Sequence, residues 1–217
     1  MLSRYLEKSF RTITQEGFYA LIIKSLRNIL CKFFGIGNEI IFELNLESFS
    51  DEFQPRMELS FQFASETDLH IIQNEIYGYN NKGIKKSMER FHKGDKCLLS
   101  LYQGTIIGYV WIMRGRMERS SSQYIDLPDH RVYLYNGFVL EEFRGKRVLN
   151  SMDSFLIHRF KKEHKRTLIT VVARDNISSI KARERMGFKR VGHITVIGLL
   201  GYQYGHIPKK DLTYLKT

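Results

Sequence analysis

The stretch FVLEEFRGKRVLNSM, residues 138–152, decides the fold because a strand-like run passes directly into a helical one. Between the two runs lie Arg144, Gly145, Lys146 and Arg147. The first turn of a helix presents unpaired backbone N–H groups and the positive end of the helix dipole, and both attract anions. Acidic side chains are favoured at a helix N-terminus, so three cations there are unexpected. A bound diphosphate would explain them. Solvated surface cations are the simpler alternative for so short a tract.

The net charge of +11 is concentrated around this stretch. Residues 141–190 hold fourteen Lys and Arg against six Asp and Glu, whereas residues 1–56 hold seven of each. Such a region attracts phosphates on a nucleic acid, a membrane or a small molecule. The chain lacks the interleaved aromatic and basic residues of RNA-binding domains, so a nucleic acid is not an expected partner.

Composition predicts one folded domain with an appendage. The chain has 217 residues, 43% hydrophobic and 26% charged, with three prolines. We expect an N-terminal helix and linking strand over 1–56 and the main domain over 57–217. Two distant cysteines, no secretory signal and no uninterrupted apolar run of about 18 residues predict a cytoplasmic protein without a transmembrane helix. The histidines show no metal-ligand spacing, so no metal is expected.

The N-terminal segment 17–34 has the pattern of a basic amphipathic helix. Phe18, Ile22 and Leu26 fall on one face, while Lys24 and Arg27 fall on the opposite one. Its apolar face either docks on this protein, or on a second copy in a homodimer, or lies on a membrane surface. The last alternative would make the protein peripheral at the inner membrane face.

The remaining pattern predicts an α/β fold with a mixed central sheet. Strands are expected at 41–49, 57–63, 131–140 and 167–175, a hairpin at 96–113 and a closing strand or hairpin at 193–204. Helices are expected at 65–78, 83–94, 145–164 and 176–188, and a polar loop at 115–129. A strand, a helix and a strand over 131–174 form a βαβ crossover with parallel strand pairing.

This order of elements, with EEFRGKRVL and the later NISSIKARERMGF, resembles the GCN5-related N-acetyltransferase (GNAT) superfamily over about residues 57–204. The resemblance implies the acyl-CoA N-acyltransferase fold and acetyl-CoA as co-substrate. The family's phosphate loop reads Arg/Gln-x-x-Gly-x-Gly/Ala, which falls on residues 144–149. Arg147 and Leu149 stand where the family usually has small residues. The second motif aligns with Asn176, Ser179, Ile180, Gly187 and Phe188, although Asn176 and Ser179 also suit a plain helix N-cap.

The resemblance also implies where the co-substrate binds. The strand ending at Val139 splays from its neighbour, and its backbone pairs with the pantetheine arm. The implied cofactor-binding residues are Gly137, Phe138, Val139, Arg144, Gly145, Lys146, Arg147, Val148, Leu149, Asn176 and Ser179.

The proton path is less defined because the strand 131–139 carries no carboxylate. Strand alternation places Tyr133, Tyr135 and Gly137 on one face, so either tyrosine is a candidate to relay a proton through water. Packing is the alternative role for both. Other candidates for the base are Asp129, His130, Glu141 and Glu142. Arg183 occupies the position of the family's acid tyrosine, which leaves Tyr202 and Tyr204 as substitutes.

The expected activity is an acetyl-CoA-dependent N-acetyltransferase acting on a primary amine. By analogy with related domains, the acceptor would be a small molecule such as an amino sugar of a surface-polysaccharide precursor. A protein or peptide amine is one alternative, and a non-catalytic acyl-CoA-binding module is another.

Overall fold

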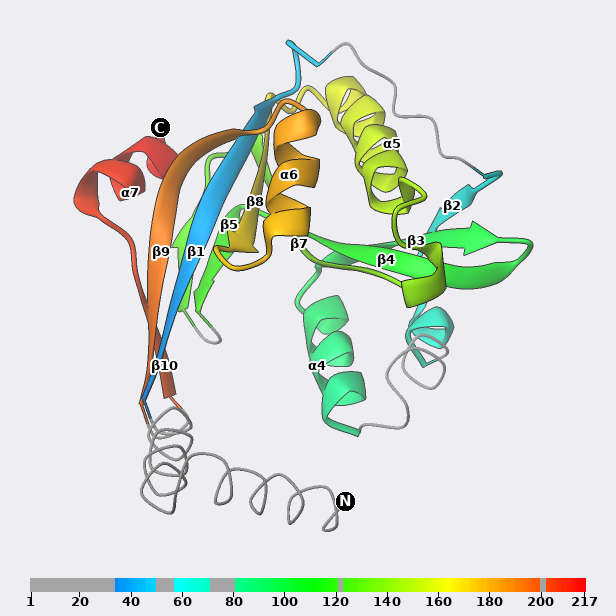
Figure 1. The fold of residues 1–217 in the computed structure, drawn as a ribbon, viewed down its shortest axis with the longest axis horizontal. Coiled ribbons are helices and arrows are strands. Elements are labelled where there is room, and N and C mark those ends of the chain that lie inside the picture. Colours follow the sequence, from blue (N-terminus) through cyan, green and yellow to red (C-terminus); the bar gives the residue numbers. More distant parts are fainter. Residues whose placement is uncertain (1–33, 50–56, 71–80, 121–122, 200–201) are drawn as a thin grey trace, which may run out of the picture.

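The computed structural model describes residues 34–49, 57–70, 81–120, 123–199 and 202–217. Within them, an eight-stranded sheet has the order β10-β9-β1-β8-β7-β4-β3-β2, and β5 and β6 form a separate hairpin (Figure 1). The strands are β1 (Phe34–Asn45), β2 (Ser60–Phe63), β3 (Lys96–Tyr102), β4 (Thr105–Arg114), β5 (Arg116–Ser120), β6 (Gln123–Asp126), β7 (Arg131–Val139), β8 (Thr167–Ala173), β9 (Lys189–Leu199) and β10 (Tyr202–His206). The helices are α4 (Asn81–His92), the 3-10 helix η1 (Glu141–Phe143), α5 (Val148–Lys162), α6 (Ile177–Arg185) and α7 (Lys209–Lys216).

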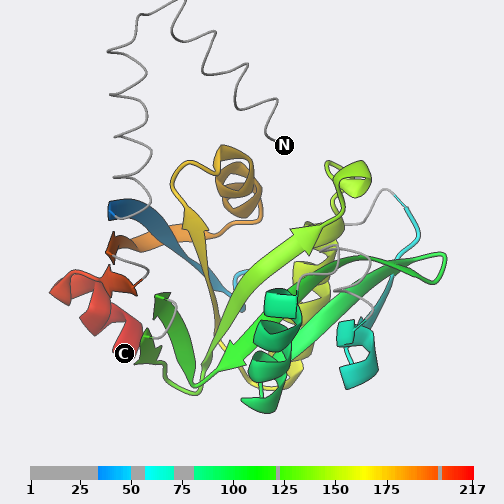
Figure 2. The ribbon, with the colours of Figure 1, turned by 90° about the horizontal axis from the view of Figure 1, so that it is seen from below.

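The two faces of the sheet have separate cores. Helices α5 and α6 cover one face, where Met152, Leu156 and Ile180 pack on Val132 and Leu134. Helix α4, the β5–β6 hairpin and α7 lie on the other face (Figure 2). The expected mixed sheet and βαβ crossover are confirmed, because β7 and β8 pair in parallel across α5.

The strand expected to link the N-terminal segment to the domain is instead part of the central sheet, as β1. It lies inside the sheet, with Glu39 opposite Ala173 of β8 and Ile194 of β9. The glycines at 35 and 37 read as a break in the sequence, yet they pair within β1. The sheet therefore includes residues before 57, the expected start of the domain. The predicted helix over 17–34 lies outside the described residues, except for its last residue, which begins β1.

Two further elements were not expected. The polar loop predicted at 115–129 contains β5 and β6, whose only buried apolar pair is Met117 opposite Ile125. With a single apolar pair among polar residues, the sequence shows little of the apolar–polar alternation by which strands are recognised, so the hairpin was not predicted. Helix α7 was also missed, since it spans only eight residues. No helix among the described residues is both long and apolar enough to cross a membrane.

Candidate functional site

The divergence of β7 and β8 places the candidate site. Their parallel pairing runs from Arg131 opposite Thr167 to Leu134 opposite Thr170 and ends there. Both strands continue, to Val139 and Ala173, and Figure 2 shows them separating. The backbone of the second half of β7 is therefore not paired with β8, as the predicted splay requires.

A β-bulge in β7 sets the direction of its side chains at this point. Between the pairs Trp111–Tyr135 and Tyr109–Phe138, β7 has one residue more than β4, and Asn136 has a φ of 47°. Because of this extra residue, the side chains after Asn136 point to the opposite faces from those that simple alternation predicts. A Cβ built on Gly137 would lie 3.1 Å from Leu149 Cδ1 of α5, whereas Tyr133 and Tyr135 face the other core. The expectation that all three share a face was wrong.

The loop before α5 has the backbone of an anion site. Gly145 and Arg147 both have left-handed φ values, 75° and 64°, and Arg147 is the N-cap of α5 without a side-chain cap bond. A non-glycine residue in this conformation costs about 1 kcal/mol. This explains why glycine, the family's usual residue, suits position 147. The N–H groups of the first turn of α5 have no cap from the side chain of its N-cap residue.

The cations of this loop are exposed, and none of the ion pairs found among the described residues includes Arg144, Lys146 or Arg147. Arg144 Nε donates to Val139 O at 3.2 Å, which ties the loop to the end of β7. Its guanidinium lies 6.0 Å from the Phe138 ring centroid, and Lys146 Nζ lies 5.0 Å from that of Phe143. Glu141 and Glu142 are exposed in η1 beside them.

The second motif caps α6. Asn176 Oδ1 accepts from Ser179 N at 3.1 Å and from Ser178 Oγ at 3.0 Å. Asn176 is thus the N-cap of α6, while Ser179 is not a cap residue and supplies the backbone N–H that donates to Asn176. Contact of either residue with acetyl-CoA stays a prediction. Arg183 is buried in an ion pair with Asp153 of α5. Arg183 therefore links α6 to α5, and its charge is engaged with Asp153.

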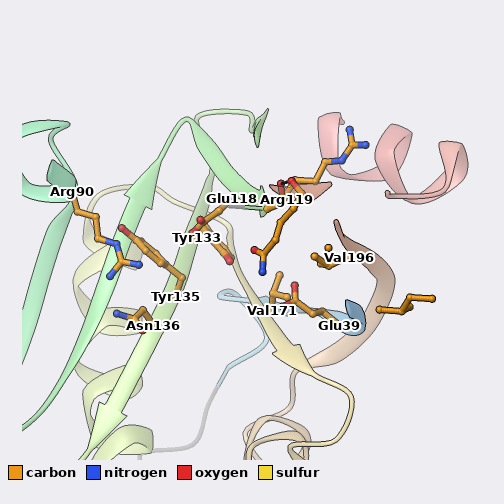
Figure 3. Close-up of a pocket in the computed structure, with 14 residues that line it drawn as sticks. Glu39, Arg90, Glu118, Arg119, Tyr133, Tyr135, Asn136, Val171 and Val196 are labelled. Carbon is orange, nitrogen blue, oxygen red and sulfur yellow. Dashed lines mark hydrogen bonds between the residues drawn. The ribbon is translucent and has the colours of Figure 1, made fainter. Parts of the chain in front are cut away.

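A cavity of about 510 Å³ lies at the divergence, on the face opposite α5 and α6 (Figure 3). Its walls come from β1, α4, β5, β7, β8, β9 and β10. The lining side chains used below are Glu39, Arg90, Glu118, Arg119, Tyr133, Tyr135 and Asn136. Both predicted tyrosines therefore reach one site, on the opposite face of the sheet from the phosphate loop.

The two tyrosines are stacked, with ring centroids 5.4 Å apart. Tyr135 donates its hydroxyl to Asp95 Oδ2 at 2.8 Å, and Arg116 pairs with Asp95 Oδ1 at 3.2 Å. Burial is the main cause that raises the pKa of both hydroxyls. Both are therefore neutral at physiological pH and unsuited as bases, which leaves donation or relay as their chemistry.

The carboxylates of the cavity were missed by the sequence analysis. Burial raises the pKa of Glu39, and the nearby charge of Glu118 raises it further. Glu39 and Glu118 also contribute to raising the pKa of Tyr133, so the three groups interact electrostatically. A carboxylate with a raised pKa inside a cavity is a candidate proton acceptor. Both belong to segments, β1 and β5, that the sequence pattern placed outside the site.

The other candidate bases lie away from the cavity. Asp129 is exposed and pairs with Lys165, at the end of β7 opposite the divergence. His130 adjoins it, and burial is the main cause that lowers its pKa. Tyr204 is exposed on β10 under the guanidinium of Arg119, whereas the side chain of Tyr202 lies outside the described part of the chain. No group of three metal-ligating side chains gathers among the described residues.

A family model, the acetyltransferase (GNAT) family, matches residues 39–188. The chain belongs to the GNAT family. The match begins at Glu39 in β1 and ends at Phe188 of the second motif. It confirms the predicted family and fold class, and acetyl-CoA is the co-substrate that this family uses. No curated protein matches the chain.

Solved structures share the GNAT fold at low sequence identity. A functionally unknown conserved protein from Staphylococcus epidermidis is 15% identical, with a TM-score of 0.54, over 79% of this chain and 65% of that one. A putative GNAT-family acetyltransferase from Novosphingobium aromaticivorans is 12% identical, with a TM-score of 0.52, over 76% and 65%. A Drosophila protein is 12% identical, with a TM-score of 0.54, over 82% and 57%. The chain thus spans about three fifths of the length of these proteins.

Proposed function

We propose that this GNAT protein is an acetyl-CoA-dependent N-acetyltransferase of a small-molecule primary amine. The observation that carries the proposal is the cavity at the divergence of β7 and β8, with Glu39 and Glu118 in its wall. Two carboxylates attract an ammonium ion, and the cavity's volume falls in the usual range of about 300–1,000 Å³ for small-molecule sites.

The face with α5 and α6 suits acetyl-CoA. The uncapped N–H groups at the start of α5, with Arg144, Lys146 and Arg147, would hold the pyrophosphate. The backbone of Gly137, Phe138 and Val139 would bind the pantetheine arm, and Asn176 and Ser179 would border it. When bound, acetyl-CoA supplies an acetyl group activated as a thioester.

On the cavity side, Glu39 would accept the proton that the amine must lose before it attacks. Its raised pKa brings it closer to that of the amine, which makes the transfer less unfavourable. The new bond joins nitrogen to the acetyl carbon while the bond between that carbon and sulfur breaks. After the attack the nitrogen must lose a second proton and the leaving sulfur must gain one, and Tyr133 would relay that proton from nitrogen to sulfur through water.

An amino sugar of a surface-polysaccharide precursor remains the acceptor that we propose to test first. Supporting it are the volume of the cavity and the tyrosine rings in its wall, against which a sugar could pack. Protein and peptide amines form the comparison set.

The test measures thiol release from acetyl-CoA with amino sugars, their nucleotide-linked forms, polyamines and peptides. We expect turnover with a small primary amine and loss of that turnover in Glu39→Gln. Calorimetry of acetyl-CoA runs in parallel. Tight acetyl-CoA binding without turnover on any amine would favour the non-catalytic acyl-CoA-binding module instead.

A further inference from the structure

The cavity has opposite charges at its two ends. Figure 3 shows Arg90 on one side and Glu39 on the other, with Tyr135 and Tyr133 between them. Arg90 comes from the last turn of α4, and Glu39 comes from β1. A ligand that bridges them needs a cation at one end and an anion at the other.

Arg90 is held on an aromatic platform. Its guanidinium carbon lies 5.0 Å from the ring centroid of Tyr135 and 5.5 Å from that of Trp111. Both rings are buried, with exposed fractions of 6% and 2%. Stacking on rigid rings orients the planar guanidinium and leaves its N–H edges for a ligand.

The neighbouring charges do not neutralise Arg90 directly. The two carboxylate oxygens of Asp95 are used by Tyr135 and Arg116. Arg119 donates to the backbone oxygen of Gly205 and lies over Tyr204. Among the described residues, no hydrogen bond or ion pair uses the guanidinium of Arg90, although the charge of Asp95 is close enough to interact with it.

We propose that the acceptor carries an anionic group, a carboxylate or a phosphate, that binds Arg90 while its amine lies toward Glu39 and Glu118. This rests on the proposed function and narrows its substrate class to amines with an anion in the same molecule. Guanidinium forks bind both kinds of oxyanion by paired hydrogen bonds, and a partly enclosed cavity strengthens them.

The experiment compares amines that differ only in the anion. One pair is glucosamine and glucosamine 6-phosphate, and the other is 1,5-diaminopentane and lysine. For each amine we measure kcat/KM with acetyl-CoA as co-substrate. Separately, calorimetry on the full chain saturated with coenzyme A gives the dissociation constant of each amine. We expect the anionic member of at least one pair to be favoured about 10- to 100-fold. The pair that shows the preference separates phosphate from carboxylate.

Variants of α4 assign the preference to Arg90. Arg90→Gln should remove the preference by raising KM for the anionic member much more than KM for the neutral member, and Arg90→Lys should retain part of the preference. Lys85→Gln, an exposed cation on the same helix, is the matched control. The inference is wrong if neither anionic probe binds more tightly than its counterpart, or if Arg90→Gln weakens both members equally. Because calorimetry needs no turnover, a failure of catalysis would count against the proposed function alone.

Discussion

The two faces of the sheet at the divergence of β7 and β8 are built in opposite ways. On the α5 side, a single contiguous loop presents exposed cations and helix N–H groups. On the α4 side, residues from seven separate elements surround a partly enclosed cavity, with Arg90 at one end and Glu39 at the other (Figure 3). The first face suits a ligand with constant chemistry, and the second is adaptable, since each wall residue can change independently. Because the two faces are built from different residues, a substitution on one face should leave the function proposed for the other unchanged.

The largest expected effect is on the cavity side. Glu39→Gln should lower turnover by about 100-fold or more, because a general base contributes about 10² to 10⁴. The dissociation constant of acetyl-CoA should not change, since Glu39 lies on the opposite face from the phosphate loop. Glu47→Gln, an exposed carboxylate just after β1, is the control. Unchanged turnover in Glu39→Gln would move the role of base to Glu118.

On the cofactor side, Arg144→Ala should weaken acetyl-CoA binding by about 1.5 to 3 kcal/mol, through loss of a charge-assisted bond to phosphate. Gly145→Val should weaken it as well, because a β-branched residue is strained at a φ of 75°. Calorimetry measures both, with the exposed Arg166→Ala at the far end of β8 as control. Wild-type affinity in both variants would remove the assignment of this loop.

A smaller effect is expected from the tyrosine relay. Tyr133→Phe should lower turnover by about tenfold, equivalent to roughly 1.4 kcal/mol in the barrier, with unchanged acetyl-CoA affinity. Tyr135→Phe should do less, since its hydroxyl is already bonded to Asp95. Steady-state kinetics with the exposed Tyr124→Phe as control decide this. Full turnover in both variants would show that the tyrosines only pack.

The smallest effect concerns stability. Burial raises the pKa of Glu39 in the folded state above its usual value of 4.5, so the folded protein binds that proton more tightly than the unfolded chain. The resulting stabilisation is present below the unfolded pKa and is lost as the pH rises through the folded pKa. Glu39→Gln should therefore raise the melting temperature at pH 7 by about 1 to 4 °C, and not at pH 4. An equal shift at both pH values would contradict the raised pKa.

The strand, loop and helix of the α5 face could be predicted from sequence because they are adjacent in the chain, whereas their contact with acetyl-CoA stays a prediction. A strand, the loop 144–147 and a helix follow one another, and the N-cap at Asn176 has its own local signature. The cavity could not be predicted in the same way. Glu39 and Glu118 come from a run broken by glycines and from a polar stretch, and only the pairing of distant strands brings them together. The bulge at Asn136 could not be recognised from the sequence either. Simple alternation of side chains along β7 therefore placed Gly137 on the wrong face.

The position of β1 has a consequence for synthesis on the ribosome. This strand is translated before every other described element, yet both of its partners, β8 and β9, follow most of the chain. Until β8 and β9 emerge, β1 lacks the neighbours that it has in the sheet, and the large sequence separation makes this pairing slow to form. The proposed proton acceptor on β1 is therefore assembled late, and a nascent chain that ends before β9 contains the loop 144–147 but has an incomplete cavity.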